Sequence, residues 1–260
     1  MPTFDDLISE ALAAPISGWD FGWLDWPQRR KGWLPWSYRR EVARRAAPLA
    51  GPMLDMGTGG GERLSRLPSR PPQTVATEAW PPNVPVAATR LTPLGIAVVQ
   101  DEGAPDNVVQ GDDDRGRLPF RNGAFALVAN RHEAFRAREV SRVLATGGTF
   151  ITQQVDFHGY DDLYRLLGLA VPAQPDSWLP LARQQVRDAG LTVQAAVRGE
   201  ERHEFRDVGA LVYYLRVVSW AVPEYSLDAC RPALRAAHEA SELWPASFRQ
   251  RHFLLVAAKL

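Results

Sequence analysis

The sequence contains a single cysteine, Cys230, among its 260 residues. One thiol excludes an intramolecular disulfide framework and any zinc site built from several thiolates, and it fits a reducing compartment. No apolar run reaches the roughly 18 residues that a membrane-spanning helix requires. The first residues, MPTFDDLISE, are acidic and lack the basic start of a signal peptide. We therefore expect a cytoplasmic protein with no bound metal and no membrane partner.

An excess of charge of one sign is also absent, because 30 Lys and Arg residues balance 30 Asp and Glu residues. This balance argues against a surface built to neutralise a nucleic-acid backbone, although a local basic patch is compatible with it. With 45% apolar and 23% charged residues, the composition is that of an ordinary folded chain. The length allows one large α/β domain or two small ones.

Short apolar segments alternate with helical segments along most of the chain. Strands are predicted in PMLDM and at Thr74–Glu78, Ile96–Gln100, Phe125–Asn130, Thr149–Val155, Leu191–Val197 and His252–Ala258. Helices are predicted at Tyr38–Ala47, from Pro81 to Arg90, and at Glu133–Leu144, Ser177–Ala189, Ala210–Val222 and Leu227–Leu243. Ser37 is expected to cap the first of these helices, and Gly147 with Gly148 to end the third. The alternation predicts a mostly parallel sheet with helices on both faces, an α/β fold. Before Ser37 the sequence shows no clear helix or strand period.

A glycine-rich turn, Asp55–Gly61 (DMGTGGG), lies between the first predicted strand and a predicted helix. Glycines at such a point let the backbone approach a ligand closely. The spacing is G-x-G-x-G, whereas a dinucleotide site uses G-x-G-x-x-G to hold a pyrophosphate. Asp55 would repel a pyrophosphate but can pair with an ammonium group, which favours a ligand with an amino-acid end. Glu78 ends the second predicted strand, where a carboxylate can accept hydrogen bonds from a ribose diol.

Together with this turn and Glu78, the segments Leu118–His132 and Val140–Ile151 carry a family resemblance. They resemble class I S-adenosylmethionine-dependent methyltransferases of the type 11 group. The resemblance covers about Trp36 to Val155 and extends more loosely to LPWSY and to the final RHFLLVAAK. It implies a Rossmann-like, seven-stranded, mostly parallel sheet whose last strand is antiparallel, and S-adenosylmethionine as the cofactor.

Carried over residue by residue, the resemblance implies that Glu78 binds the ribose hydroxyls and that Asp55 lies at the methionine end of the cofactor. The other residues implied at this cofactor site are Gly57, Thr58, Gly59, Gly61 and Asn130. An acidic residue before Leu118 would accept a hydrogen bond from the adenine amino group. Because of an insertion, three residues compete for this role, namely Asp112, Asp113 and Asp114, with Asp113 and Asp114 favoured.

Residues that follow the fourth and fifth predicted strands lie where ligands bind open α/β sheets. His132 is the candidate catalytic residue, a general base for a substrate hydroxyl. The alternative is a histidine that packs against the methionine moiety or hydrogen-bonds the backbone. Candidate substrate contacts are Trp36, Tyr38, His158 and Tyr160. Gln153 and Gln154 should point to opposite faces of their strand, so at most one faces the substrate.

Aromatic residues are concentrated near the N-terminus, at Trp19, Phe21, Trp23, Trp26, Trp33, Trp36 and Tyr38. Exposed apolar surface of this size promotes association, so we expect these side chains to be buried. We predict that residues 1–47 form an aromatic cap or lid, that residues 48–260 form the cofactor-binding domain, and that residues 206–245 form a helical substrate cap within it. The simpler interpretation is that the tryptophans fill a groove at the edge of the sheet.

The leading functional hypothesis is a methyltransferase that transfers the methyl group to an O, N or C atom of a small molecule. The alternative is an RNA (rRNA or tRNA) base methyltransferase. Basic residues at 29–31 beside several tryptophans support this alternative, whereas the neutral overall charge disfavours a nucleic-acid partner. The intact acids and glycines argue against a non-catalytic binding protein. The glycine spacing argues against an NAD-dependent oxidoreductase, and the single cysteine argues against a zinc enzyme.

Overall fold

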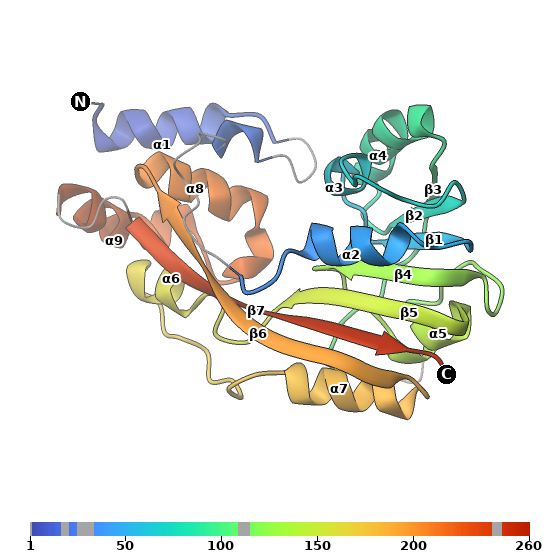
Figure 1. Cartoon of the computed structure of the whole chain (residues 1–260). Helices are drawn as coiled ribbons and strands as arrows, with labels where there is room; N and C mark the ends of the chain where they lie inside the picture. Colours follow the sequence, from blue (N-terminus) through green and yellow to red (C-terminus); the bar gives the residue numbers. More distant parts are fainter. Residues whose placement is uncertain (1, 17–20, 25–33, 109–114, 241–245) are drawn as a thin grey trace. The chain divides into compact units, whose positions relative to one another are not determined.

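The computed structural model of the chain describes residues 2–16, 21–24, 34–108, 115–240 and 246–260 (Figure 1). Several residues with predicted roles lie outside these ranges, namely Asp112, Asp113, Asp114, Trp19, Trp26 and Trp33. Among the described residues, no helix is long and apolar enough to cross a membrane.

The chain divides into two compact units. The sheet unit comprises Pro35–Val155, Trp178–Arg198 and His252–Leu260, and the helical unit comprises Met1–Leu34, Asp156–Ser177 and Gly199–Arg251. The glycine turn and Glu78 belong to the sheet unit. Two residues of the N-terminal aromatic segment, Phe21 and Trp23, belong to the helical unit. Phe21 stacks on Tyr214, and Trp23 packs on Tyr213.

The sheet unit contains the strands β1 (Met53–Met56), β2 (Thr74–Glu78), β3 (Ala97–Gln100), β4 (Phe125–Arg131) and β5 (Leu144–Val155). Its helices are α2 (Tyr38–Ala46), α3 (Glu62–Ser65), α4 (Asn83–Leu91), α5 (Ala137–Val143) and α7 (Leu179–Asp188). The helical unit contains α1 (Phe4–Ala13), α6 (Asp161–Leu166), α8 (Val208–Val217) and α9 (Leu227–Glu239). Two long strands run through both units, β6 (Thr192–Phe205) and β7 (Ala246–Ala258). Short 3₁₀ helices are found at Gly22–Leu24, Thr92–Leu94 and Ser219–Ala221.

The seven strands form one sheet in the order β3-β2-β1-β4-β5-β7-β6. Strands β1 to β5 pair in parallel, and β7 runs antiparallel to β5. This arrangement confirms the predicted fold class, including the antiparallel last strand. The strand order reverses between β1 and β4, and ligands of open α/β sheets bind at the carboxyl ends of the strands next to such a reversal. The register places Met56 beside Asn130 and Glu78 beside Gln100 at this edge.

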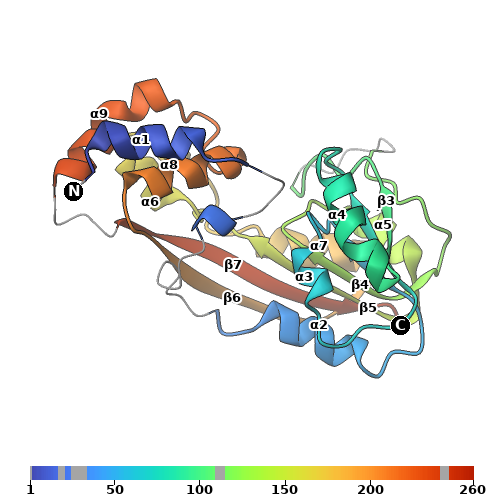
Figure 2. The same ribbon diagram turned by 90° about the horizontal axis from the view of Figure 1, so that it is seen from above.

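Helices cover both faces of the sheet unit. Apolar side chains of α2, α3 and α4 pack with those of β1, β2 and β4 in one buried cluster. Figure 1 shows α2 on one face of the sheet and α7 on the other, and Figure 2 shows the same helices from above. As predicted, α2 begins after Ser37, whose hydroxyl accepts a hydrogen bond from the N–H of Arg40.

Two predictions for the segment between β4 and β5 are wrong. The helix expected at Glu133–Leu144 begins only at Ala137, because Arg136 is still in an extended conformation. Gly147 and Gly148 do not end that helix but lie within β5, which starts at Leu144. Gly147 donates a backbone hydrogen bond to the carbonyl of Lys259, and the carbonyl of Gly148 accepts one from the N–H of Lys259. These bonds, together with the pairing of Leu144 with Phe125 of β4, extend β5 backwards.

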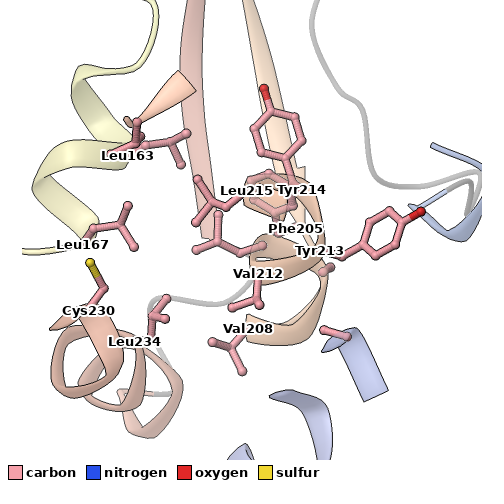
Figure 3. Packing of buried hydrophobic residues seen from close by; sticks show 14 of the residues in the cluster. Leu163, Leu167, Phe205, Val208, Val212, Tyr213, Tyr214, Leu215, Cys230 and Leu234 are labelled. Atoms are coloured by element: carbon pink, nitrogen blue, oxygen red, sulfur yellow. The ribbon is translucent and has the colours of Figure 1, made fainter. Parts of the chain in front are cut away.

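The prediction also missed α1, where no periodic element was expected. Thr3 and Asp6 form a capping box, and the helix buries Phe4, Leu7, Ile8 and Ala11. These side chains join the core of the helical unit with residues of α6, α8 and α9. Figure 3 shows Leu163 and Leu167 near Cys230 and Leu234, with residues of α8 beside them.

The contact between α1 and α8 is close enough to test with one methyl group. A Cβ at Gly209 would lie 2.7 Å from the carbonyl oxygen of Leu7. In an isolated helix Gly→Ala stabilises by about 1 kcal/mol, whereas here the added methyl must displace α1. We expect Gly209→Ala to destabilise the protein by about 1–3 kcal/mol in urea unfolding. Stabilisation by the variant would show that α1 does not pack on α8 in solution.

Candidate functional site

The glycine turn after β1 lies against two side chains of the chain itself. Gly57 and Gly61 have positive φ values of 69° and 79°, a conformation that L side chains rarely adopt. A Cβ at Gly57 would lie 2.3 Å from the Cβ of Glu133, and a Cβ at Gly61 would lie 2.8 Å from Leu91. Both positions therefore require glycine, and the close approach at Gly57 is made by Glu133.

The Glu78 carboxylate ties the end of β2 to this turn. Its Oε2 accepts a 2.6 Å hydrogen bond from the N–H of Gly59, and its Oε1 accepts a 2.9 Å bond from the N–H of Trp80. The residue is 3% exposed, and burial raises the pKa of Glu78 although the two backbone donors oppose the rise. Each carboxylate oxygen still has a second lone pair with which to accept a ligand hydroxyl.

Three further carboxylates lie with Glu78 at the carboxyl ends of β1, β3 and β4. Asp55 lies in β1, Asp101 directly follows β3, and Glu133 follows β4. Burial and the charge of Glu78 raise the pKa of Asp55 to about 6, with Thr58 and Arg63 opposing the rise. Burial raises the pKa of Glu133 to about 8, and the charges of Glu78 and Asp101 add to this effect. Burial also raises the pKa of Asp101. Mutually repelling acids at one edge create a negative potential that suits a cationic ligand.

Several buried polar atoms near these acids have no hydrogen-bond partner among the described residues. Asn83 is fully buried, and its carboxamide makes no hydrogen bond of normal geometry, although it lies close enough to Glu78 to lower the pKa of that carboxyl. The hydroxyl of Tyr38 is likewise buried and without a partner in this part of the chain, and it lies near Asp55. The buried hydroxyl of Thr58 lies close enough to Asp55 to lower the pKa of that carboxyl. Because buried polar atoms are normally paired, such atoms mark positions where a ligand or water supplies the missing partner.

Asn130 holds the turn that follows β4. Its Oδ1 accepts two 2.6 Å hydrogen bonds, from the Thr152 hydroxyl and from the Gln154 amide, and its Nδ2 donates to the carbonyl of Glu133 at 3.1 Å. The amide of Gln154 also donates to that carbonyl, at 3.0 Å. This buried network positions the backbone at Glu133. The predicted direct contact between Asn130 and a cofactor stays a prediction.

His132 projects from the same turn with an unusual backbone conformation. Its φ is 62°, a left-handed value that is uncommon outside glycine and costs about 1–3 kcal/mol. The backbone N–H donates to the carbonyl of Gln153 at 2.9 Å, and the exposed imidazole stacks on His252 with ring centroids 5.3 Å apart. Strain of this kind is often kept at functional positions, which supports the choice of His132 as a functional candidate.

The four predicted substrate contacts are divided between the two units. Trp36 and Tyr38 lie in the sheet unit, at the start of α2. His158 and Tyr160 lie in the helical unit, where the Nδ1 of His158 is 3.0 Å from an Asp161 carboxylate oxygen. Burial raises the pKa of Tyr160 to about 12. Contact of all four residues with a substrate stays a prediction.

The structure places three further residues around Glu78 that no sequence motif named above includes. The position of Asp101 directly after the third predicted strand indicates a site residue. The run of aspartates at 112–114 matches the family pattern better. Glu133 was assigned to the first turn of a helix that in fact starts at Ala137. Asn83 was one polar residue within a predicted helix, with no signal of burial.

Comparison with protein-family models finds no match, and no curated protein matches. Solved structures do match over most of the chain. A protein from Bacillus halodurans whose methyltransferase name is itself provisional has a TM-score of 0.56 at 17% identity, covering 86% of this chain and 98% of its own. The YcgJ protein from Bacillus subtilis has a TM-score of 0.54 at 18% identity, with 85% and 97% covered. A Deinococcus radiodurans protein of unknown function has a TM-score of 0.53 at 12% identity, with 90% and 92% covered. At these identities the similarity establishes the fold alone, a Rossmann-like α/β fold that this chain shares with these proteins.

The half-buried acid at position 133 makes stability depend on pH. A carboxyl whose pKa is raised to about 8 stabilises the folded chain fully below its unfolded pKa, and this contribution is lost as the pH rises through 8. We expect Glu133→Gln to raise the Tm by several degrees at pH 9 and to leave it nearly unchanged at pH 5. Thermal unfolding at the two pH values measures the difference.

Glu139 offers a matched control of opposite sign. Burial pushes its pKa up, but hydrogen bonds from Arg142 and from the N–H of Leu118 outweigh that effect and lower the pKa. Glu139→Gln should therefore destabilise the chain at pH 9, and the loss should shrink as the pH falls toward 3. A Glu133→Gln protein that melts lower than the parent at pH 9 would show that the carboxylate is paired in solution.

Proposed function

We propose that this chain is an S-adenosylmethionine-dependent methyltransferase that acts on a small-molecule acceptor. The observation that carries the proposal is the meeting of Asp55, Glu78, Asp101 and Glu133 at the carboxyl ends of four neighbouring parallel strands, around the glycine turn. A ligand for this site must bring positive charge and hydroxyl donors. S-adenosylmethionine carries an ammonium group, a sulfonium and a ribose diol, whereas the pyrophosphate of NAD would be repelled.

The residues present fit this cofactor. Glu78 would accept hydrogen bonds from the ribose hydroxyls. The buried carboxamide of Asn83, which makes no hydrogen bond of normal geometry among the described residues, lies beside Glu78. Asp55 and Glu133 would face the cationic end. Trp80 follows Glu78 by two residues and is 42% exposed, which suits packing against a flat purine. The predicted adenine acceptors, Asp113 and Asp114, lie outside the described residues.

The bound cofactor would supply a methyl group that its positive sulfur already activates. The chain would contribute binding, orientation and exclusion of water, because an in-line displacement gains most from proximity. The neutral overall charge disfavours a nucleic-acid substrate and so favours a small molecule. This molecule would receive the methyl group on an O, N or C atom. His132 would lie on the acceptor side, together with Trp36 and Tyr38 of the same unit.

The lid interpretation of residues 1–47 needs a test other than truncation. Because α1 forms part of the helical core, a deletion up to Pro35 would remove core side chains as well as any lid. Loss of turnover in such a variant would therefore not identify the cause. Protection of this segment from proteolysis when the demethylated cofactor is added is the cleaner measurement.

The first test is cofactor binding by calorimetry. We expect S-adenosylmethionine and its demethylated product to bind, and NAD and NADP to give no signal. Glu78→Ala removes charge-assisted hydrogen bonds worth on the order of 1.5–3 kcal/mol, so affinity should fall at least tenfold. Asp188→Ala, at an exposed position on α7, is the matched control and should bind like the parent. Tight NAD binding, or unchanged affinity in Glu78→Ala, would contradict the proposal.

A second test uses the titration of Glu133. If the cationic end of the cofactor faces Glu133, binding must ionise a carboxyl whose pKa is about 8 in the free protein. Affinity should then rise about eightfold between pH 6.5 and pH 7.5. Binding heats in buffers with different ionisation enthalpies should show proton release. Glu133→Gln should bind more weakly and without this pH dependence; a pH dependence that survives in the variant would assign it to another group.

The acceptor itself requires a screen. Cell extract incubated with methyl-labelled cofactor and the protein should place label in the small-metabolite fraction. Label confined to RNA would instead support the RNA alternative, and a protein with Glu78→Ala controls for background transfer.

A further inference from the structure

In the sheet unit, the side chains of Trp36, Gln153 and His132 contact one another in series. The indole Nε1 of Trp36 donates a 2.8 Å hydrogen bond to Oε1 of Gln153, and Nε2 of Gln153 lies 3.3 Å from Nε2 of His132. Gln153 is 2% exposed, and the N–H of His132 donates to its backbone carbonyl. The carboxamide of Gln153 is therefore held on both sides, by residues from before α2 and after β4.

Trp36 decides which way the Gln153 carboxamide points. The two ends of a glutamine side chain are often hard to tell apart, and the hydrogen-bond partners settle the question. An indole N–H can only donate, so the oxygen of Gln153 must face Trp36. Its NH₂ group must then face His132.

This orientation decides where the imidazole carries its hydrogen. The NH₂ group of Gln153 is a donor, so the His132 nitrogen beside it must accept and must carry no hydrogen. A neutral imidazole has one N–H, which therefore lies on Nδ1. A doubly protonated ring would place an N–H against the Gln153 NH₂ group. The ring of His252, stacked at 5.3 Å, would also repel the charge of His132 whenever it carries a charge itself.

We propose that Trp36 and Gln153 are positioning residues that hold His132 as the neutral Nδ1–H tautomer, and that His132 assists methyl transfer as a hydrogen-bond donor. The role of donor rests on the proposed function; the tautomer does not. The lone pair of the ring points at Gln153, so it does not accept a proton from a substrate. This replaces the general-base role expected from the sequence.

The donor role narrows the class of methyl acceptor. A hydrogen bond from Nδ1–H orients an oxygen or ring nitrogen that has a free lone pair. The fitting acceptor is a small molecule that carries a carbonyl, phenolate or similar oxygen at or beside the methylated atom. Its nucleophile would need no deprotonation by His132, because the sulfonium already activates the methyl group.

Nitrogen NMR of histidine-labelled protein tests the tautomer without any cofactor. The chain has five histidines, so the imidazole spectrum is simple, and loss of one signal set in His132→Asn assigns His132. At pH 8.5, where an ordinary histidine is neutral, we expect Nδ1 of His132 to be protonated and Nε2 to be bare. The reverse pattern, or a fast equal mixture of the two tautomers, would overturn the proposal.

Two variants test the cause. Trp36→Phe removes the indole N–H and frees the Gln153 carboxamide to turn over, so His132 should become a mixture of tautomers. Gln153→Glu provides an acceptor on both sides and should move the hydrogen to Nε2. Trp178→Phe is the matched control, because its indole donates to the carbonyl of Val155 and not to Gln153. An unchanged His132 spectrum in both Trp36→Phe and Gln153→Glu would refute the positioning role.

Activity distinguishes a donor from a base once the extract screen provides an acceptor. The amide of asparagine places an N–H close to the position of Nδ1, whereas that of glutamine reaches the position of Nε2. His132→Asn should therefore retain clearly more turnover than His132→Gln, and equal loss in both would contradict the donor role. If NMR shows the Nδ1–H tautomer but S-adenosylmethionine does not bind, the proposed function fails while the tautomer assignment stands.

Discussion

Burial of several carboxylates at one edge of the sheet is the constraint on which the functional part of this structure depends. Glu78 is the centre of the group, because its two oxygens hold the N–H groups of Gly59 and Trp80 and so join β2 to the glycine turn. Burial and, to a lesser extent, the charge of Glu78 raise the pKa values of Asp55 and Glu133. An acid that organises the turn therefore also makes its neighbours costly to ionise until a cation arrives.

Under the proposed function, this arrangement lowers the stability of the free protein and raises its affinity for the cofactor. The side chain of Glu133 lies against Gly57, so a Cβ at Gly57 would clash with it. The amide of Asn130 holds the backbone carbonyl of Glu133. The buried carboxamide of Asn83 lacks a partner among the described residues. Groups kept in such states are destabilising alone and become favourable when a ligand completes them, which is the usual relation between stability and function at binding sites.

The turn after β4 combines two kinds of control. Asn130 and Gln154 hold its backbone through buried hydrogen bonds, while Gln153, the next residue along β5, points to the other face and contacts His132. The expected alternation of Gln153 and Gln154 thus serves two separate tasks. One side of β5 positions an acid, and the other orients an imidazole.

Local patterns in the sequence determined the strands β1 to β4, the cap of α2, the glycine turn and the acid at Glu78, because each depends on neighbours within a few residues. Tertiary structure decided the rest. Glu133 and Asp101 meet Glu78 only through the parallel register of separate strands, and the tautomer of His132 follows from Trp36, which is far away in the sequence. The helix α1 did carry a local signal that the prediction missed, because its capping box and the spacing of its buried residues are those of a helix. Strand β5 is longer than predicted because Leu144 pairs with Phe125 of β4 and Lys259 exchanges hydrogen bonds with Gly147 and Gly148. Contacts between distant residues leave no periodic trace in either partner, so only the folded chain reveals them.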